Sequence, residues 1–342
     1  MLPIALPPGD PAGIGPDITL LAWVDRAATA LPAFVVVGDA EALSTRATEL
    51  GLTVPIQRVG HASEAVSAFA DALPVLHQPL PEHPRAGAPT AENGAAVIRA
   101  IETASVLAMQ GHMRAVTTAP IAKHVLYRAG FTHPGHTEFL HALSLSNAPS
   151  ETAPRPVMLL VADDLRAAPL TIHEAIRDVP SLITAEAIDE TVRILDDGLR
   201  SSFGLPSPRI AVSGLNPHAG EAGTIGCEDR DIIEPSIKTL VADGIHVTGP
   251  HSADTMFHRA ARQTYDAALT MFHDQALIPV KTLAFDTGVN ITLGLAFIRT
   301  SPDHGTAFEL AGTGRANPAS LISALRLADQ LASNPMPAMG VQ

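Results

Sequence analysis

Residues 4–17 read IALPPGDPAGIGPD and contain the first strand, loop and helix start of the chain. A short apolar strand is followed by glycines at positions 9, 13 and 15, in the spacing G-x-x-x-G-x-G. Pro16 suits the first position of a helix beginning near Asp17, because the N–H that proline lacks would have no helical partner there. A strand, a glycine loop and a helix in this order are typical of an α/β domain.

The same glycine spacing occurs in the nucleotide loop of short-chain dehydrogenases, whose catalytic pair is Tyr-x-x-x-Lys. The chain has two tyrosines, and Phe131 stands four residues after Tyr127 and Leu269 four residues after Tyr265. The Tyr-x-x-x-Lys pair is therefore absent, and the loop is not that of a short-chain dehydrogenase. No G-x-G-x-x-G stands at a strand-to-helix junction, so the Rossmann fingerprint is missing as well. We interpret the loop as a tight turn that starts a helix.

Strand and helix patterns alternate along the rest of the chain, which predicts an α/β protein with a largely parallel sheet. Proline-rich or polar stretches at residues 76–89 and 146–156 are expected to be surface connections, the second near a domain crossing. The expected strands are residues 33–37, 114–118, 157–162, 167–172, 209–213 and 267–272, and the expected helices are 40–50, 92–110, 185–199 and 318–331, with another opening at Pro120.

Length and composition limit the class of protein. The chain has 342 residues, 46% hydrophobic and 17% charged, which predicts a compact globular protein of about two domains. Its net charge of −13 makes nucleic acid an unsuitable partner, although a few local cations could still bind a phosphorylated small molecule. The single cysteine, Cys227, allows no internal disulfide and suits a reducing compartment. We find neither a signal peptide nor a membrane span, so we expect a cytoplasmic protein.

Titratable residues collect at predicted element ends. His136 and Thr137 open a helix, where side-chain donors and free backbone N–H groups suit an anion such as phosphate; Thr137 could instead simply cap that helix. Arg299 is expected to end a strand and can grip a phosphate or carboxylate with two donors, or form a surface ion pair. Asn290 is either a ligand contact or part of a satisfied turn.

Three histidines follow predicted strands. His173 comes after residues 167–172, His218 lies in the loop after residues 209–213, and His273 follows residues 267–272 together with Asp274. Ligands bind outside the carboxyl ends of strands in open α/β sheets, and three neutral imidazoles suit Zn²⁺, Co²⁺ or a similar ion. Residues separated by 45 and 55 positions carry no local metal signature, and for the loop residue His218 a solvated histidine is the alternative.

Several blocks of sequence together resemble the 4-hydroxythreonine-4-phosphate dehydrogenases of vitamin B6 biosynthesis. The resemblance runs in order from residue 4 to about residue 330, almost the whole chain. The blocks are GDPAGIGPD (9–17), TAPIAK (118–123), GHTEFL (135–140), LNPHAGE (215–221), ADT (253–255), MFHDQALIPVK (271–281) and VNITLGLAFIRTSPDHGTAFELAGTGRA (289–316).

The resemblance implies the fold of isocitrate and isopropylmalate dehydrogenases, with two α/β/α domains, a cleft between them and no Rossmann fingerprint. The domains are expected at residues 1–138 plus 300–342 and at residues 139–299, the second carrying the metal histidines and a dimer interface. It further implies a homodimer whose active site lies at the subunit interface.

The implied reaction is NAD- or NADP-dependent oxidation of 4-phosphohydroxy-L-threonine at C3 to a β-keto acid, which loses CO₂ to leave 3-amino-2-oxopropyl phosphate. A divalent metal (Zn²⁺, Mg²⁺ or Co²⁺) would assist. The implied roles fall on the following residues: metal ligands His173, His218 and His273; substrate contacts His136, Thr137, Lys281, Asn290 and Arg299; catalytic groups Lys281, Asp254 and Asp274. The cofactor is expected to bind among loops near residues 290–314, and no individual cofactor-binding residue is assigned.

The chain departs from the usual family pattern at four positions, none of them a metal or substrate residue. Asp17, Ala122, Phe272 and Ala276 stand where Glu, Asn, Tyr and Gly are usual. A dehydrogenase of the same fold that acts on threonate or erythronate 4-phosphate, or on an aromatic cis-dihydrodiol, is the alternative, and a non-catalytic binding protein of two α/β domains is another.

Overall fold

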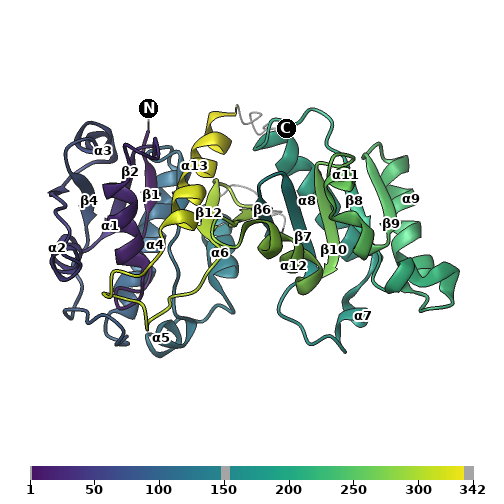
Figure 1. Cartoon of the computed structure of the whole chain (residues 1–342), viewed down its shortest axis with the longest axis horizontal. Coiled ribbons are helices and arrows are strands. Elements are labelled where there is room, and N and C mark those ends of the chain that lie inside the picture. The colour runs from purple at the N-terminus through teal and green to yellow at the C-terminus, as the bar shows by residue number, and fades with distance from the viewer. Residues whose placement is uncertain (1, 148–154, 335–342) are drawn as a thin grey trace. The chain divides into compact units, whose positions relative to one another are not determined.

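The computed structural model describes residues 2–147 and 155–334. Its contacts divide the chain into two compact units (Figure 1). Unit 1 is formed by the described residues up to 156 together with residues 295–333, and unit 2 by residues 157–294 with Asn334. In the residues described, no helix is both long and apolar enough to cross a bilayer.

Unit 1 contains a parallel sheet in the order β3-β4-β2-β1-β5-β12. The paired register Ile4 with Phe34 and Ile4 with Ala115 puts β1 between β2 and β5. Its elements are β1 (Ile4–Leu6), α1 (Gly15–Val24), β2 (Phe34–Gly38), α2 (Ala40–Glu49), β3 (Ile56–Arg58), α3 (Ala62–Ala68), β4 (Leu73–His77), α4 (Gly94–Met109), β5 (Ala115–Thr117), α5 (Lys123–Arg128), α6 (His136–Asn147), β12 (Arg299–Pro302) and α13 (Ala319–Ser333).

Both faces of this sheet are covered, and its strands are therefore apolar on both sides. Ile4 and Leu6 of β1 point to the face carrying α1, α2 and α13, whereas Ala5 points to the face carrying α3, α4 and α6. The alternation follows from the two-residue period of a strand. Figure 1 shows α1 and α13 beside β1 and β12, which agrees with the apolar cluster that joins them.

Unit 2 has the strand order β11-β6-β7-β10-β8-β9. Strands β7, β10, β8 and β9 are parallel, so their carboxyl ends meet at one edge. The elements are β6 (Val157–Ala162), β7 (Leu165–Thr171), α7 (Val179–Leu182), α8 (Ala185–Ser201), β8 (Ile210–Ser213), η1 (Pro217–Gly223), η2 (Asp229–Ile233), α9 (Glu234–Ala242), β9 (Val247–His251), α10 (Ala253–Met256), α11 (Arg259–Arg262), β10 (Ala267–Phe272), α12 (His273–Ala284) and β11 (Val289–Leu293).

The expectation of a largely parallel sheet is correct for unit 1 and incomplete for unit 2. Strands β6 and β7 form an antiparallel hairpin, and β11 pairs antiparallel with β6. The hairpin turn is only two residues long, and Asp163 has a φ of +52°, which short hairpin turns require. The apolar runs of β6 and β7 match buried parallel strands equally well, so their composition did not distinguish the two arrangements.

Some expected boundaries differ from the structure. The expected division assigns residues 139–299 to the second domain, whereas the described residues 139–147, 155–156 and 295–299 belong to unit 1, because Phe139, Leu140 and Phe297 pack into its apolar cluster. The helix expected at Pro120 begins at Lys123. The expected connection at residues 76–89 begins inside β4. Residues 148–154 of the expected connection at 146–156, and residues 335–342 of the first expected domain, lie outside the described residues.

Candidate active site

In unit 1 the chain changes direction across the sheet between β1 and β5. Beyond β1, the connection leads to β2 on one side, and β5 and β12 lie on the other. In open α/β sheets ligands bind at such a switch point, outside the carboxyl ends of the strands. The loops at this edge are the glycine loop after β1 and residues 118–122 after β5. A ligand-binding site is therefore expected at this edge of the sheet.

The glycine loop is filled by the protein's own backbone. A Cβ atom on Gly9 would lie 2.1 Å from the carbonyl oxygen of Pro120, and one on Gly15 would lie 1.9 Å from that of Pro8. The backbone N–H of Asp10 donates to the Pro120 carbonyl at 3.0 Å. The glycines thus let two loops approach each other closely, and α1 begins at Gly15. These contacts fit a tight turn that starts a helix.

Beside these loops lies a buried cationic cluster. Arg299 is 4% exposed, and its Nε and Nη2 atoms donate to Oγ1 of Thr118 at 3.2 and 2.8 Å. Arg299 opens β12, so the expectation that it ends a strand is wrong, and its burial rules out a surface ion pair. Thr118 went unrecognised from sequence, although it lies in the TAPIAK block directly after β5.

His136 is the first residue of α6, and Thr137 the second. The Nε2 atom of His136 is shielded from solvent and has no hydrogen-bonding partner. Desolvation lowers the pKa of His136 well below its ordinary value, and the positive charge of Arg299 lowers it further. Burial also lowers the pKa of Arg299 to about 10, so at neutral pH a neutral imidazole lies close to a fixed cation. An unpaired buried nitrogen beside a buried guanidinium is suited to receiving an anionic ligand.

In unit 2 two of the three candidate metal histidines lie together. His173 follows β7, His273 is the first residue of α12 directly after β10, and their ring centroids are 5.8 Å apart. The register that pairs Phe272 with Thr171 explains this, because it aligns the ends of the two strands. Nδ1 of His273 lies 2.8 Å from Oδ1 of Asp274. That contact orients the imidazole and leaves Nε2 as the nitrogen available to a metal.

His218 lies in the turn η1 after β8, the strand that neighbours β10. Residues 218–222 all have left-handed backbone angles, with φ between 42° and 76°. For residues other than glycine this conformation costs about 1 kcal/mol or more each, and such strain is concentrated at functional sites. Within the described chain, the nitrogens of His173, His218 and His273 do not all lie within 4.8 Å of one another.

Gln275, recognised from sequence only within the block MFHDQALIPVK, joins the two histidine-bearing segments. Its Oε1 accepts from the backbone N–H of Met271 at 2.9 Å, and its Nε2 donates to the carbonyl of Gly214 at 3.0 Å. The side chain therefore holds the start of α12 against the loop that carries His218. A polar side chain directly after a predicted buried strand was the only signal for it.

The remaining expected residues also lie in unit 2. Lys281 lies on α12 with Nζ 5.4 Å from the centroid of Phe285, and the helical rise puts it about 12 Å along the axis from His273. Asn290 lies on β11, and its buried Oδ1 has no hydrogen-bonding partner. Asp254 is exposed on α10 and accepts from Oγ of Ser252 at 2.5 Å.

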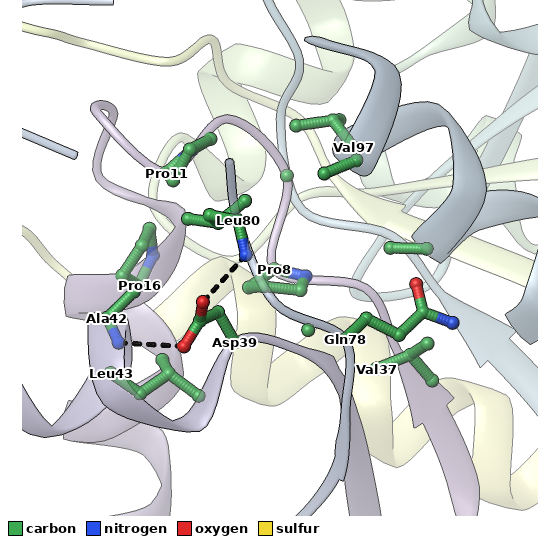
Figure 2. A pocket seen from close by; sticks show the side chains of 14 residues that line it. Pro8, Pro11, Pro16, Val37, Asp39, Ala42, Leu43, Gln78, Leu80 and Val97 are labelled. Atoms are coloured by element: carbon green, nitrogen blue, oxygen red, sulfur yellow. Dashed lines mark hydrogen bonds between the residues drawn. The ribbon is translucent and has the colours of Figure 1, made fainter. Parts of the chain in front are cut away.

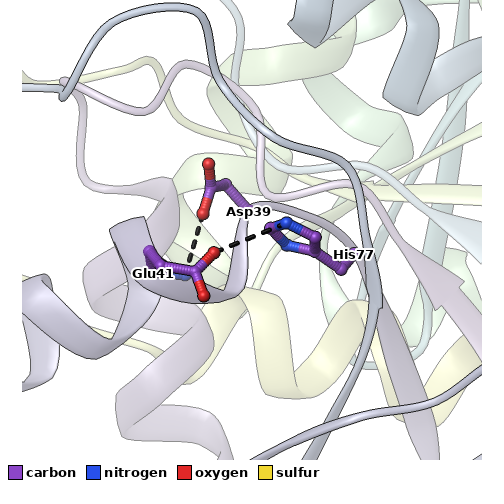
Figure 3. A group of neighbouring side chains, drawn as sticks. All are labelled: Asp39, Glu41 and His77. Atoms are coloured by element: carbon purple, nitrogen blue, oxygen red, sulfur yellow. Dashed lines mark hydrogen bonds and ion pairs between the residues drawn. The ribbon is translucent and has the colours of Figure 1, made fainter.

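Asp39, Glu41 and His77 form the one group of at least three described acidic, histidine or cysteine residues whose ligand atoms all lie within 4.8 Å (Figure 3). The backbone N–H of Ala40 donates to Nδ1 of His77 at 3.1 Å, so the proton of the neutral ring lies on Nε2, which is 3.4 Å from Glu41. Oδ1 of Asp39 caps α2, and Glu41 also pairs with Arg58. The carboxylate of Asp39 is committed to the helix cap and that of Glu41 to ion pairs, so the group is structural.

A small cavity lies next to this cap, lined by Pro8, Pro16, Leu43, Leu80 and Val97 among others (Figure 2). Its volume is about 30 Å³, which holds one or two water molecules and no larger ligand. The dashed contacts in Figure 2 show Asp39 accepting from the backbone N–H groups of Ala42 and Leu80. This cavity is therefore a packing defect beside the cap.

The comparisons with known proteins agree with each other. Residues 30–328 match the family model described as pyridoxal phosphate biosynthetic protein PdxA. A protein of Methylorubrum populi named 4-hydroxythreonine-4-phosphate dehydrogenase is 53% identical over 337 residues, covering 97% of this chain and 95% of the relative. The chain belongs to the pyridoxal phosphate biosynthetic protein PdxA family. It is an oxidoreductase, as its relatives are named dehydrogenases.

Solved structures support the same assignment. The crystal structure of 4-hydroxythreonine-4-phosphate dehydrogenase from Klebsiella pneumoniae has a TM-score of 0.86 and 37% identity, covering 97% of this chain and all of that one. A terephthalate 1,2-cis-dihydrodiol dehydrogenase from Burkholderia xenovorans LB400 has a TM-score of 0.64 and 28% identity, covering 96% and 98%. The two-unit α/β fold is thus that of this family.

The donor set of unit 2 fits a divalent metal ion. Imidazole nitrogens bind Zn²⁺ and Co²⁺ well, and a carboxylate on the second ring nitrogen is the usual way of fixing such a ligand. His273 has that carboxylate in Asp274, and His173 lies beside it. The strained turn under His218 is the third element suited to this role.

Proposed function

We propose that this protein is a 4-hydroxythreonine-4-phosphate dehydrogenase, which oxidises 4-phosphohydroxy-L-threonine at C3 with NAD⁺ or NADP⁺ and a divalent metal. The observation that carries the proposal is the 53% identity to a relative of that name over 97% of the chain. All eight residues that the family resemblance assigns to metal and substrate are present.

The buried cluster of unit 1 would hold a charged end of the substrate. Arg299 remains protonated at neutral pH, and Thr118 fixes the plane of its guanidinium, so donors of known direction face the ligand. The neutral imidazole of His136 supplies a hydrogen-bonding group at Nε2, which needs a partner when buried. Thr137 adds a hydroxyl one residue further into α6. Together these groups would orient the reacting carbon.

The metal, held by His173, His218 and His273, would lower the pKa of the substrate hydroxyl and withdraw charge from the carbonyl group that replaces it. Asp274 would keep His273 in the ligating tautomer. Oxidation transfers a hydride from C3 to the nicotinamide and releases the hydroxyl proton. The resulting β-keto acid breaks its bond to the carboxyl carbon, releases CO₂ and takes a proton, which gives 3-amino-2-oxopropyl phosphate.

Lys281 would move a proton or bind a negative group of the substrate, and Asn290 would offer its buried Oδ1. About 12 Å of helix axis separates Lys281 from His273, and the long side chain of Lys281 would reach toward the substrate from that position. Asp254 is the remaining candidate for moving a proton.

A homodimer with a shared active site is part of the proposal. The nitrogens of the three histidines do not all come within 4.8 Å in one chain, which favours completion of the metal site by a second copy. Ile278 on α12 is 63% exposed, and Phe285, directly after this helix, is 74% exposed. Large apolar side chains so exposed are typical of surfaces that bind another protein. A fully active monomer in light scattering would contradict this part.

A second candidate substrate class is favoured by one observation. The terephthalate dihydrodiol dehydrogenase matches 96% of the chain, so a dihydrodiol substrate deserves a direct comparison. Its TM-score of 0.64 is well below the 0.86 of the Klebsiella pneumoniae enzyme, which favours the phosphorylated amino acid.

The deciding experiment measures NADH or NADPH absorbance with 4-phosphohydroxy-L-threonine, threonate and erythronate 4-phosphates, and a cis-dihydrodiol, each with and without chelator. We expect turnover of the first substrate, abolished by chelator and restored by Zn²⁺, Co²⁺ or Mg²⁺. Preference for another substrate would replace the proposed one, turnover that persists under chelation would exclude the metal, and no turnover of any substrate would favour a binding protein.

A further inference from the structure

The turn that carries His218 needs an external support. Its five consecutive left-handed residues have backbone angles opposite in sign to those of an ordinary helix, and four of the five are not glycine. A conformation of this kind persists only where the surroundings impose it. The structure must therefore contain a group that holds residues 214–222 in place.

That group is the carboxylate of Asp229, the first residue of η2. The side chain is 1% exposed. Its Oδ1 accepts from the backbone N–H of Leu215 at 2.8 Å, and its Oδ2 accepts from the backbone N–H and the Nδ2 of Asn216 at 3.2 and 2.8 Å. All three donors belong to the segment between β8 and His218.

Two glycines make room for this carboxylate. A Cβ atom on Gly214 would lie 2.6 Å from Oδ1 of Asp229, and one on Gly220 would lie 3.2 Å from Oδ2. The turn therefore wraps around the Asp229 side chain on both sides of His218. Asn216 is held a second time, because its Nδ2 donates to Glu228 at 2.8 Å.

We infer that Asp229 is a positioning residue, which by holding residues 214–220 sets the direction in which His218 reaches the divalent metal. The inference rests on the proposed metal role of His218. Asp229 itself is turned toward the backbone of the turn and is fully used there, so it affects the metal only through His218.

The sharpest variant is Asp229→Asn, which keeps the size of the side chain and replaces one acceptor oxygen by an N–H donor. Whichever way the amide turns, its NH₂ group then faces backbone or side-chain donors of the turn, and at least one hydrogen bond is lost. Asp231→Asn is the matched control, because Asp231 lies two residues further on, is exposed, and its carboxylate pairs with Arg230.

The full-length protein is stripped of metal and titrated with Co²⁺, following heat of binding and the visible absorption of the ion. We expect Asp229→Asn to weaken Co²⁺ binding about 10–100-fold and to change the cobalt spectrum, as loss of support for a ligand does. Asp231→Asn should match the wild type in both. At saturating Co²⁺ the kcat of Asp229→Asn should return toward the wild-type value, since Asp229 does not touch substrate.

Wild-type affinity and spectrum in Asp229→Asn would overturn the inference. If Asp229→Asn does not fold, Asn216→Ala removes one of the three donors while keeping the buried carboxylate, and it should weaken Co²⁺ binding about threefold or more. Unchanged binding in a folded Asn216→Ala would overturn the inference as well. His218→Ala distinguishes failure of the positioning role of Asp229 from failure of the metal role of His218. If His218→Ala binds Co²⁺ like the wild type, the proposed metal role of His218 is wrong.

Discussion

The guanidinium of Arg46, on α2, lies buried against the carboxylate of Asp17, on α1. The same guanidinium donates to the backbone carbonyls of Pro11 and Gly13 at 3.1 Å, and Oδ1 of Asp17 accepts from the backbone N–H of Gly312 at 2.7 Å. One buried pair therefore joins α2, the glycine loop and the segment before α13. Desolvation raises the pKa of Asp17, and the charge of Arg46 opposes that rise.

Removing one member of this pair should destabilise the fold more than removing both. Arg46→Met leaves a buried carboxylate without its cation, which costs about 3–5 kcal/mol, whereas the double variant Arg46→Met with Asp17→Leu should lose less. Urea unfolding of the two variants and of Glu49→Gln, an exposed partner of Arg46, measures the difference. A double variant less stable than Arg46→Met would show that the charges are not the main contribution.

The close approach at Gly9 can be separated from its backbone conformation. Gly9 and Gly51 both have left-handed φ values, +74° and +65°, but only Gly9 has a carbonyl oxygen where a Cβ would lie. Gly51→Ala should cost about 1 kcal/mol, the ordinary penalty of that conformation. Gly9→Ala should lower the free energy of unfolding by at least twice as much, because two loops must move apart. Equal losses would contradict the packing described here.

The lowered pKa of His136 gives the stability a pH dependence. The unfolded chain takes up a proton on this residue below about pH 6.5, and the folded protein resists it, so the folded state loses stability as the pH falls below that value. His136→Gln should remove this contribution, up to about 1.4 kcal/mol per pH unit. Thermal unfolding at pH 7.0 and 5.5 tests it, with the exposed His112→Gln as control. A wild-type pH slope in His136→Gln would contradict it.

Arg299→Lys keeps a positive charge and loses the planar donors that Thr118 orients. The KM for the phosphorylated substrate should rise about 10-fold or more, a loss of about 1.4 kcal/mol or more. Arg128→Lys on α5 is the control, because this arginine is exposed on the same unit. An unchanged KM in Arg299→Lys would remove the residue from substrate binding.

Asp274→Asn tests the orientation of His273. The amide can present a donor where the imidazole N–H needs an acceptor, so the ligating tautomer loses its support, and metal affinity should fall about 10–100-fold. Equilibrium dialysis against Zn²⁺ measures this, and Asp286→Asn, an exposed residue beyond α12, is the control. Full Zn²⁺ affinity in Asp274→Asn would contradict the assignment.

The sequence predicts those features that depend on neighbouring residues. Strands at residues 157–162 and 267–272 are found with the expected bounds, because apolar runs bounded by polar residues specify them. The position of His173 and His273 at one edge follows from two parallel strands. Arg299 was placed at the end of a strand because apolar residues precede it, whereas the paired register of β12 begins at Arg299.

Features that depend on distant residues were not accessible in this way. Asp229 lies 11 residues beyond His218 in a polar segment, and only the fold shows that its carboxylate lies inside the turn. Arg46 occupies a helix whose pattern suits a surface, yet its side chain reaches the carbonyls of a loop more than 30 residues away. A charged side chain is buried only where it has hydrogen-bonding or ionic partners. Hydrophobic periodicity does not show which distant residues those partners are.

The atoms packed against the glycine loop carry partial negative charge. The atoms that fill the space beside Gly9 and Gly15 are carbonyl oxygens of Pro120 and Pro8, the negative ends of peptide dipoles. A pyrophosphate placed there, as in a loop of similar spacing that binds nucleotides, would meet repulsion where it needs N–H donors. The spacing of the glycines shows only that other atoms approach the loop closely. Whether the loop can bind an anion depends on whether those atoms are N–H donors or carbonyl oxygens.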